Sequence, residues 1–260
     1  MAEDNFMEDA LSQGASDTGG RETATGEIVF SEIKQASKEQ IKGNIFLYFL
    51  VTLTWSFIAS VLIMIIMYGV GGSMMDTIKD KLGSGPVGEA EIIDAMVGVM
   101  GIFYVVVLLS AAVSLIISAF MEWGMARLAN KMYKKEMISF GDGFEGFKQP
   151  KAALSVSLLK YVYTMLWAMI PFLGLVLAFI KPYSYACATF IKQEDSNISS
   201  NDAITRSREI MDGRKFQLFL LDFSFCLIWI IPIIFTFGLA CIYVGPYWSQ
   251  ARYNFYKRLK

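Results

Sequence analysis

Three ionisable residues lie within long apolar segments of the chain: Lys160, Lys181 and Asp222. A charged side chain at the centre of a bilayer costs about 2.5–3.5 kcal/mol on insertion scales, so such residues normally face other helices and are paired. The side chain of Lys160 is long enough to reach the membrane interface, which is as good an interpretation as a pair. Asp222 is too short to do so, and we expect it to be paired with one of the lysines or hydrogen-bonded to tyrosines.

The preferred hypothesis for these residues is a buried ion pair between Asp222 and Lys181, which would hold the fourth apolar segment against the fifth. The alternative is a transport or proton-relay role for the same side chains. The residues that we expect to support this intramembrane charge cluster are aromatic residues and a proline near it in the sequence: Trp167, Tyr183, Tyr185, Trp229, Pro246 and Tyr247.

Several kinds of chemistry have no suitable residues in this chain. It has no histidine, which excludes Ser-His catalysis and the common zinc-protease motif. Cys187, Cys226 and Cys241 all fall in apolar segments without CxxC spacing, so we interpret them as buried hydrophobic residues. The glycine-rich run at 138–148 lacks the alternating acids of a calcium loop. We therefore expect no enzyme, no catalytic residue, no cofactor and no metal.

The composition indicates a membrane protein. Of the 260 residues 55% are hydrophobic and 18% charged, whereas soluble domains carry about 25% charged residues. Residues 1–27 are polar, with seven acids and a single arginine, and we predict a disordered acidic tail there. An interfacial amphipathic helix is predicted at 28–43, followed by a transmembrane domain at 44–256. No clustered basic surface is evident, so the expected partner is the lipid bilayer and not a nucleic acid.

The apolar runs predict an all-α fold with six transmembrane helices arranged as three hairpins. Pro171 and Pro232 divide the two longest runs, and Gly69 follows the first predicted span. Lysine and arginine concentrate before the first span, after the second and fourth, and after the sixth, so both termini are predicted to be cytoplasmic. The predicted spans are 44–68, 95–120, 153–170, 172–191, 216–232 and 236–256.

An internal repeat is predicted for the last two hairpins. Residues 158–167 (LLKYVYTMLW) align without a gap with residues 220–229 (LLDFSFCLIW), and an Ile-Pro pair follows each tryptophan. The first hairpin fits less well, through residues 47–49 and Trp55. We expect any symmetry to be about an axis along the membrane normal, with coincidence in a simple apolar composition as the alternative.

The C-terminal part of the chain resembles a bacterial membrane family known as domain of unknown function 975. The sharpest similarity is the run Ser-Arg-Glu-x-Met-x-Gly at 207–213, and the segments 181–185 and 34–44 are similar with less specificity. Residues 226–228 depart from the family pattern, in which a Gly-Trp pair should follow Ser-Phe, and the acidic tail also departs from it. The further matching residues are Lys215, Phe219, Asp222, Ser224, Phe225, Trp229, Thr236, Gly238, Pro246, Tyr247, Phe255 and Tyr256.

The resemblance implies a multi-pass protein of the bacterial cytoplasmic (inner) membrane and implies no activity. Together with the absence of a catalytic constellation, it favours a non-enzymatic protein that acts through contacts with a protein partner or with copies of itself: a scaffold, an accessory subunit or a stress or immunity component. The alternative is a small-molecule transporter or channel that uses Lys181 and Asp222. A polar cavity lined by these two residues would favour transport, and a dry core in which they are paired would favour the scaffold.

Overall fold

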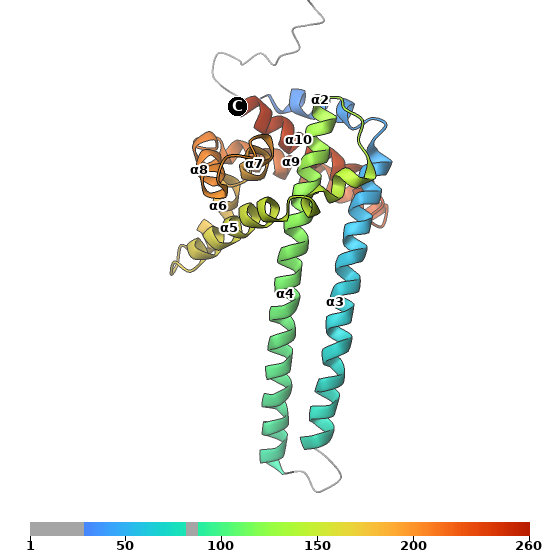
Figure 1. Ribbon diagram of the computed structural model, residues 1–260, viewed down its shortest axis with the longest axis vertical. Coiled ribbons are helices and arrows are strands. Elements are labelled where there is room, and N and C mark those ends of the chain that lie inside the picture. The colour runs from blue at the N-terminus through green and yellow to red at the C-terminus, as the bar shows by residue number, and fades with distance from the viewer. Residues whose placement is uncertain (1–28, 82–87) are drawn as a thin grey trace, which may run out of the picture.

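The computed structural model describes residues 29–81 and 88–260, and both described segments are built from helices without strands (Figure 1). The predicted all-α fold is therefore confirmed for these residues, while the predicted acidic tail lies outside them. The helices are α2 (Phe30–Gln40), α3 (Ile45–Lys81), α4 (Glu89–Tyr133), the 3₁₀-helix η1 (Phe140–Phe147), α5 (Pro150–Ala168), α6 (Gly174–Ser184), α7 (Ala188–Glu194), α8 (Ser200–Ile210), α9 (Lys215–Phe235) and α10 (Cys241–Leu259).

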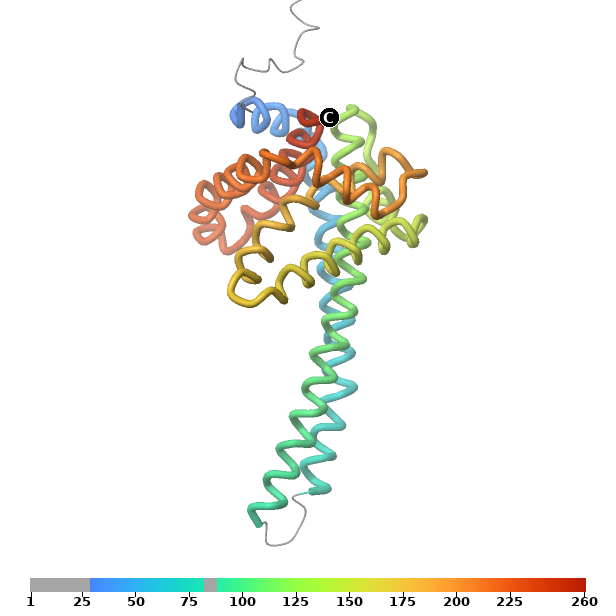
Figure 2. The backbone as a smooth tube through the Cα atoms, turned by 90° about the vertical axis from the view of Figure 1, so that its left-hand side faces the viewer, coloured from blue at the N-terminus to red at the C-terminus, as the bar shows by residue number. Residues whose placement is uncertain are grey.

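Two long antiparallel helices, α3 and α4, dominate the shape of the molecule (Figures 1 and 2). They contain 37 and 45 residues, which corresponds to about 55 and 67 Å at 1.5 Å per residue. The prediction that α3 ends near Gly69 is wrong, because the helix continues to Lys81. A glycine costs a helix only about 1 kcal/mol, and α4 packs alongside this extension, where Lys81 forms an ion pair with Asp94.

The remaining helices form a head beside the upper part of the long pair (Figure 2). Four helical segments are long and apolar enough to cross a membrane, at 45–81, 89–133, 174–194 and 215–235. Neither α5 nor α10 is among them, so six spans are not confirmed. The predicted fourth span is interrupted in the structure, because α6 ends at Ser184 and α7 begins at Ala188.

Two short helix pairs in the head, α5–α6 and α9–α10, turn at an exposed aromatic residue. Phe172 and Phe237 have positive φ angles of 64° and 51°, and both side chains are fully exposed. Pro171 follows the end of α5, as predicted, whereas Pro232 lies inside α9. Each turn therefore has an apolar aromatic side chain at its tip, which is exposed and lies outside the core of the head.

The glycine-rich run at 138–148 is a packing element. In η1, Gly143 lies so close to α3 and α4 that a side chain there would collide with Val51, and one on Gly124 would collide with the Gly143 carbonyl group. That carbonyl oxygen accepts a hydrogen bond of 3.1 Å from Trp55 Nε1. The ring of Trp55 stacks on Phe144. The glycines therefore allow the backbone of η1 to approach α3 and α4 closely, and aromatic rings pack against this contact.

The helices that precede the long apolar helices α3 and α9 have the same local form. α2 and α8 each contain 11 residues and end in a turn with a positive-φ glycine, Gly43 (81°) and Gly213 (69°). The runs SKEQIKG at 37–43 and SREIMDG at 207–213 show this register in the sequence. These two helices and their glycines correspond in a register offset by 170 residues, in which Trp55 matches Phe225, and both side chains are buried. This register differs from the predicted one, which aligns Trp55 with Trp229.

Candidate functional site

Asp222 is held between α9 and α10 by two donors from α10. Arg252 Nη2 donates a hydrogen bond of 3.0 Å to one carboxylate oxygen, and Trp248 Nε1 donates one of 2.7 Å to the other. Residues 248 and 252 lie one helical turn apart and therefore share a face of α10. The Arg252 guanidinium also stacks 4.7 Å from the Trp248 ring centroid. The predicted pair between Asp222 and Lys181 is therefore wrong, because the anion's partners come from the following helix.

Lys160 on α5 is paired with Glu122 on α4. Its ammonium group also donates a hydrogen bond of 2.9 Å to Thr189 Oγ1 on α7. The Glu122 carboxylate accepts further hydrogen bonds from Thr189, at 2.6 Å, and from Ser157, at 3.3 Å. Of the two interpretations of Lys160, the structure shows the paired one, with a partner that lies just outside the predicted second span.

Lys181 on α6 lies over an aromatic ring. Its Nζ atom is 3.7 Å from the ring centroid of Trp167 on α5, a cation–π contact worth about 0.5–2 kcal/mol. Trp167 Nε1 in turn donates a hydrogen bond of 3.0 Å to the hydroxyl of Tyr185. Tyr183 packs edge-on against Phe219 of α9 with the ring centroids 6.0 Å apart. Of the predicted supporting residues, Trp167 thus contacts Lys181 directly and Tyr185 contacts Trp167, and none of these contacts involves Asp222.

The other predicted supporting residues lie on α9 and α10. Trp229 faces Tyr243 at a centroid distance of 5.5 Å, and Tyr247 packs edge-on against Phe225 at 4.8 Å. Pro246 is buried within α10. The structure therefore divides the predicted charge cluster into three groups, centred on Lys160, Lys181 and Asp222, each with its own partners.

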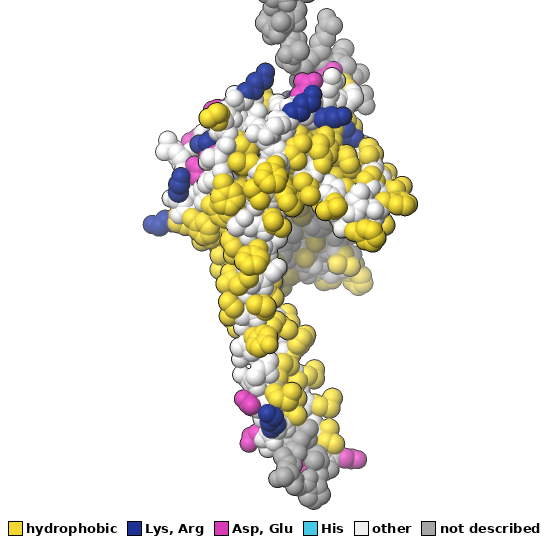
Figure 3. Space-filling model, turned by 90° about the vertical axis from the view of Figure 1, so that its right-hand side faces the viewer, with side chains coloured by type: hydrophobic (Ala, Val, Ile, Leu, Met, Phe, Trp, Pro, Cys, Tyr) yellow, Lys and Arg dark blue, Asp and Glu magenta, His cyan; other side chains and the backbone are white. Residues whose placement is uncertain are grey.

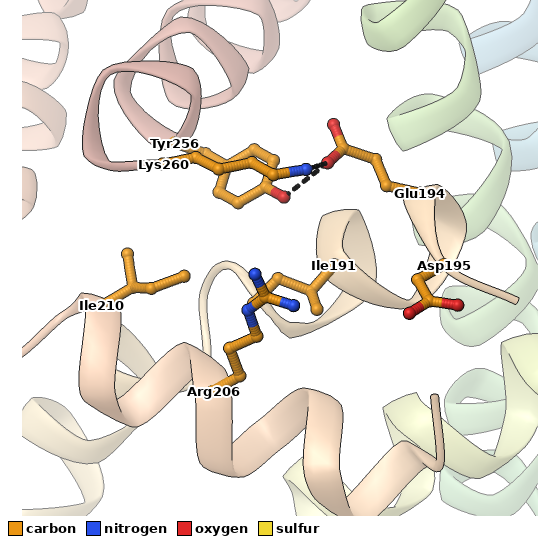
Figure 4. Close-up of a pocket in the computed structure, with 7 residues that line it drawn as sticks. All are labelled: Ile191, Glu194, Asp195, Arg206, Ile210, Tyr256 and Lys260. Carbon is orange, nitrogen blue, oxygen red and sulfur yellow. Dashed lines mark hydrogen bonds and ion pairs between the residues drawn. The ribbon is translucent and has the colours of Figure 1, made fainter. Parts of the chain in front are cut away.

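A further acidic centre, Glu194 at the end of α7, was not predicted (Figure 4). Its carboxylate accepts hydrogen bonds from Tyr256, at 2.8 Å, and Tyr253, at 3.1 Å, and pairs with Lys257 and Lys260. Three of these donors lie on α10 and Lys260 follows its last residue, and their helical spacing is visible in the sequence.

A small cavity of about 160 Å³ adjoins Glu194. Figure 4 shows Tyr256, Lys260 and Glu194 together on one side of it, and the side chain of Arg206 from α8 on the other. Acidic and basic side chains both contribute to the lining, so neither sign of charge predominates. The lining residues are Ile191, Glu194, Asp195, Arg206, Ile210, Tyr256 and Lys260.

The contact between α2 and α10 contains buried amides and hydroxyls. Asn254 donates hydrogen bonds of 2.7 Å to Ser37 Oγ and 3.0 Å to Gln40 Oε1. Gln250 donates another, of 2.6 Å, to the same Gln40 oxygen. This polar contact ties the first described helix to the last one.

Three polar seams therefore join different parts of the head: the Glu122 seam between α4, α5 and α7, the Glu194 seam between α7 and α10, and the Gln40 seam between α2 and α10. Buried polar groups of this kind stabilise a fold when their partners are present and are expensive to leave unpaired.

Among the described residues, no group of three or more Cys, Asp, Glu or His side chains is placed to hold a metal ion. The cavity beside Glu194 is lined by none of Lys160, Lys181 and Asp222.

The comparisons with known proteins agree with the sequence resemblance. The model of a family described as "Protein of unknown function (DUF975)" matches residues 175–260, from α6 to the end of α10. This match confirms the predicted resemblance over that part of the chain. No curated protein and no solved structure matches the chain significantly.

Proposed function

We propose that this chain is a non-enzymatic, multi-pass protein of the bacterial inner membrane that acts through contacts with a protein partner or with copies of itself. The observation that carries the proposal is that the charged residues of its apolar segments are engaged by neighbouring helices. Asp222 binds Arg252 and Trp248, Lys160 binds Glu122, and Lys181 lies over Trp167. Side chains used in this way hold helices together and leave no free charge to bind a solute.

The distribution of charge supports a head on the cytoplasmic side. Figure 3 shows lysine and arginine gathered over the upper head, with a broad hydrophobic surface beneath them that continues down the long helix pair. A basic side next to an apolar band is the pattern of a cytoplasmic face. The C-terminus lies in the head, as does α2 (Figure 1). We therefore propose that both termini are cytoplasmic.

The two short helix pairs are proposed to enter the bilayer beside the long pair, so that six helices contact lipid. Their tips, at Phe172 and Phe237, are fully exposed apolar residues that water would solvate poorly. Each pair leaves the head and returns to it, so the sidedness of the termini does not depend on how deeply the tips penetrate.

A threefold internal repeat is also proposed, with units α2–α4, η1–α7 and α8–α10. In each unit the leading helix contacts the last helix of the unit before it: η1 contacts α4, α8 contacts α7, and α2 contacts α10. The last of these contacts closes a ring. Such a parallel arrangement about the membrane normal would give the head a rigid form suited to holding partners.

The proposal is tested by pairing partner capture with transport measurements. A photo-crosslinking residue replaces Met137, which is 93% exposed between α4 and η1, in cells that express the full chain at its native level. The matched control places the same residue at Phe172, on the proposed lipid-facing tip. We expect one stable protein adduct, or a dimer, from position 137 alone.

The same strain, and a strain that lacks the protein, are compared in uptake and efflux assays. We expect no difference between them, because no solute pathway is proposed. Solute movement that depends on the protein and disappears in the Asp222→Asn variant would overturn the proposal in favour of a transporter.

A further inference from the structure

A second cavity lies under α2, where this polar helix crosses the apolar pair α9–α10. Its volume is about 350 Å³, within the roughly 300–1,000 Å³ typical of small-molecule sites. One side is cationic and the other is apolar and aromatic, and no acid contributes to the lining. The lining residues are Lys34, Lys38, Phe225, Ile228, Trp229, Tyr243 and Tyr247.

The two lysines lie one turn apart on α2 and therefore present their ammonium groups on the same face. Lys34 Nζ is 5.4 Å from the centroid of the buried Phe225 ring. Burial lowers the pKa of Lys34, because its charge is partly removed from water. Within the part of the chain that the structure describes, no ion pair with a carboxylate is recorded for Lys34. A nearby anion would relieve this desolvation.

The corresponding helix α8 shows that position 34 need not be charged. In the register of 170 residues, Lys34 corresponds to Ile204, which is completely buried, and Lys38 corresponds to Arg208. The architecture therefore accepts an apolar residue at position 34. The chain instead has a partly buried lysine there, beside a second lysine and an open apolar wall.

We propose that this cavity binds one anionic phospholipid, whose phosphate lies against Lys34 and Lys38. Its upper acyl segment would lie along Ile228, Trp229 and Tyr243. Basic pockets beside membrane helices on the cytoplasmic side are the usual place for such head groups. A free phosphate would satisfy the lysines but would leave the apolar wall in water, so charge and lining together fit an amphiphile.

This inference rests on the proposed placement of the head at the membrane surface, and not on the proposed scaffold role. The crosslinking experiment can fail while lipid retention holds, and lipid retention can fail while crosslinking succeeds. The two results are therefore distinguishable.

The test is native mass spectrometry of the full chain in detergent micelles doped with dioleoyl phosphatidylglycerol. A second set of micelles contains phosphatidylcholine with the same acyl chains, and a third contains the phosphatidylglycerol together with inorganic phosphate. We expect one tightly retained phosphatidylglycerol and no retained phosphatidylcholine. Phosphate at millimolar concentration should not displace the lipid.

Replacing both lysines, as Lys34→Gln with Lys38→Gln, should weaken retention roughly 25-fold, at about fivefold for each charge near the membrane surface. Lys42→Gln is the matched control, because Lys42 lies in the exposed turn after α2, outside the lining, and should retain the lipid. Ile228→Trp should also reduce retention by filling the cavity. This variant leaves both lysines in place and alters a side chain that is 58% exposed, so it decides the matter if the double variant does not fold.

Several results would overturn the proposal: unchanged retention in the folded double variant or in Ile228→Trp, equal retention of phosphatidylcholine, or displacement of the lipid by inorganic phosphate. A further competitor is the acidic segment 1–27 of the same chain. If a carbodiimide joined Lys34 to that segment equally well with and without phosphatidylglycerol, the segment and not the lipid would be the occupant.

Discussion

Asp222 and Arg252, which face each other from the consecutive helices α9 and α10, form an ion pair with 3.0 Å between the carboxylate oxygen and Nη2. Asp222 lies about as far from the end of α9, at Phe235, as Arg252 lies from the start of α10, at Cys241. The turn between the helices therefore returns the chain so that the two charges lie level. Each charge offsets part of the desolvation cost of the other.

Loss of the Lys160 ammonium group should destabilise the head. The Lys160→Met variant leaves the Glu122 carboxylate with only the hydroxyl donors Thr189 and Ser157. We expect the free energy of unfolding to fall by about 1–3 kcal/mol, the usual loss when one partner of a charged hydrogen bond is removed. Thermal unfolding in detergent measures the change. The matched control is Lys151→Met, at an exposed position on the same helix. Equal melting of the two variants would contradict the structural role of Lys160.

A methyl group on Gly124 should prevent η1 from seating against α4. The Cβ atom of Gly124→Ala would meet the carbonyl group of Gly143, a backbone atom that cannot rotate away. We expect about 1–3 kcal/mol of destabilisation, as for other overpacked sites. Gly101→Ala on the same helix meets nothing within 4 Å and should be neutral or stabilise by up to about 1 kcal/mol. Similar losses from both variants would show that η1 is not packed as described.

Asp142 should make the stability of the head dependent on pH. Burial alone would raise the pKa of this carboxyl, but the hydrogen bonds from Lys131 and the Ser139 backbone N–H outweigh burial and hold it below its usual range. A pKa that is lower in the folded than in the unfolded state contributes stability above the unfolded value, near pH 4, and that stability is lost as the pH falls through the folded value.

The measurement is the melting temperature of wild type and Asp142→Asn from pH 7 down to pH 3. The wild type should be the more stable at pH 7, and the difference should shrink below about pH 4. A constant difference across this range would show that Asp142 contributes nothing through its charge.

The tip of the α5–α6 pair should lie in lipid. A bimane label at Phe172→Cys, with the three native cysteines replaced, should be quenched strongly by lipids brominated in the acyl chain and weakly by iodide. The same label at Met137→Cys, which lies in the head between α4 and η1, should show the reverse. Iodide quenching at position 172 as strong as at position 137 would place the tip in water.

The sequence correctly predicts the elements whose cause is local. Apolar runs predict the helices, and the heptapeptide at 207–213 predicts the family resemblance, because both depend on neighbouring residues. The lengths of α3 and α4 could not be predicted in this way. Their extensions past Gly69 and before residue 95 depend on each helix packing against the other, which overrides the local effect of glycine.

The partners of the charged residues were predicted poorly for a different reason. Lys181 was the cation predicted for Asp222 because it lies in a long apolar run. Arg252 lies near the end of the predicted sixth span, in a stretch that is rich in other polar residues, and Glu122 lies just after the predicted second span. Counting residues to each side of the α9–α10 turn would have placed Arg252 level with Asp222. The close packing of the η1 glycines could not be predicted from residue spacing, because they contact residues that are distant in the sequence.

The charged residues of the apolar helices are engaged by side chains of neighbouring helices. A double-mutant cycle on Asp222→Asn and Arg252→Gln, read by thermal unfolding of the full chain in detergent, tests it most directly. The asparagine can still accept the hydrogen bond from Trp248, so the cycle isolates the ion pair.

We expect a coupling free energy of about 1–3 kcal/mol, with the double variant less destabilised than the two single variants would be together. A coupling near zero, or an Asp222→Asn variant whose fold and expression match those of the wild type, would contradict it.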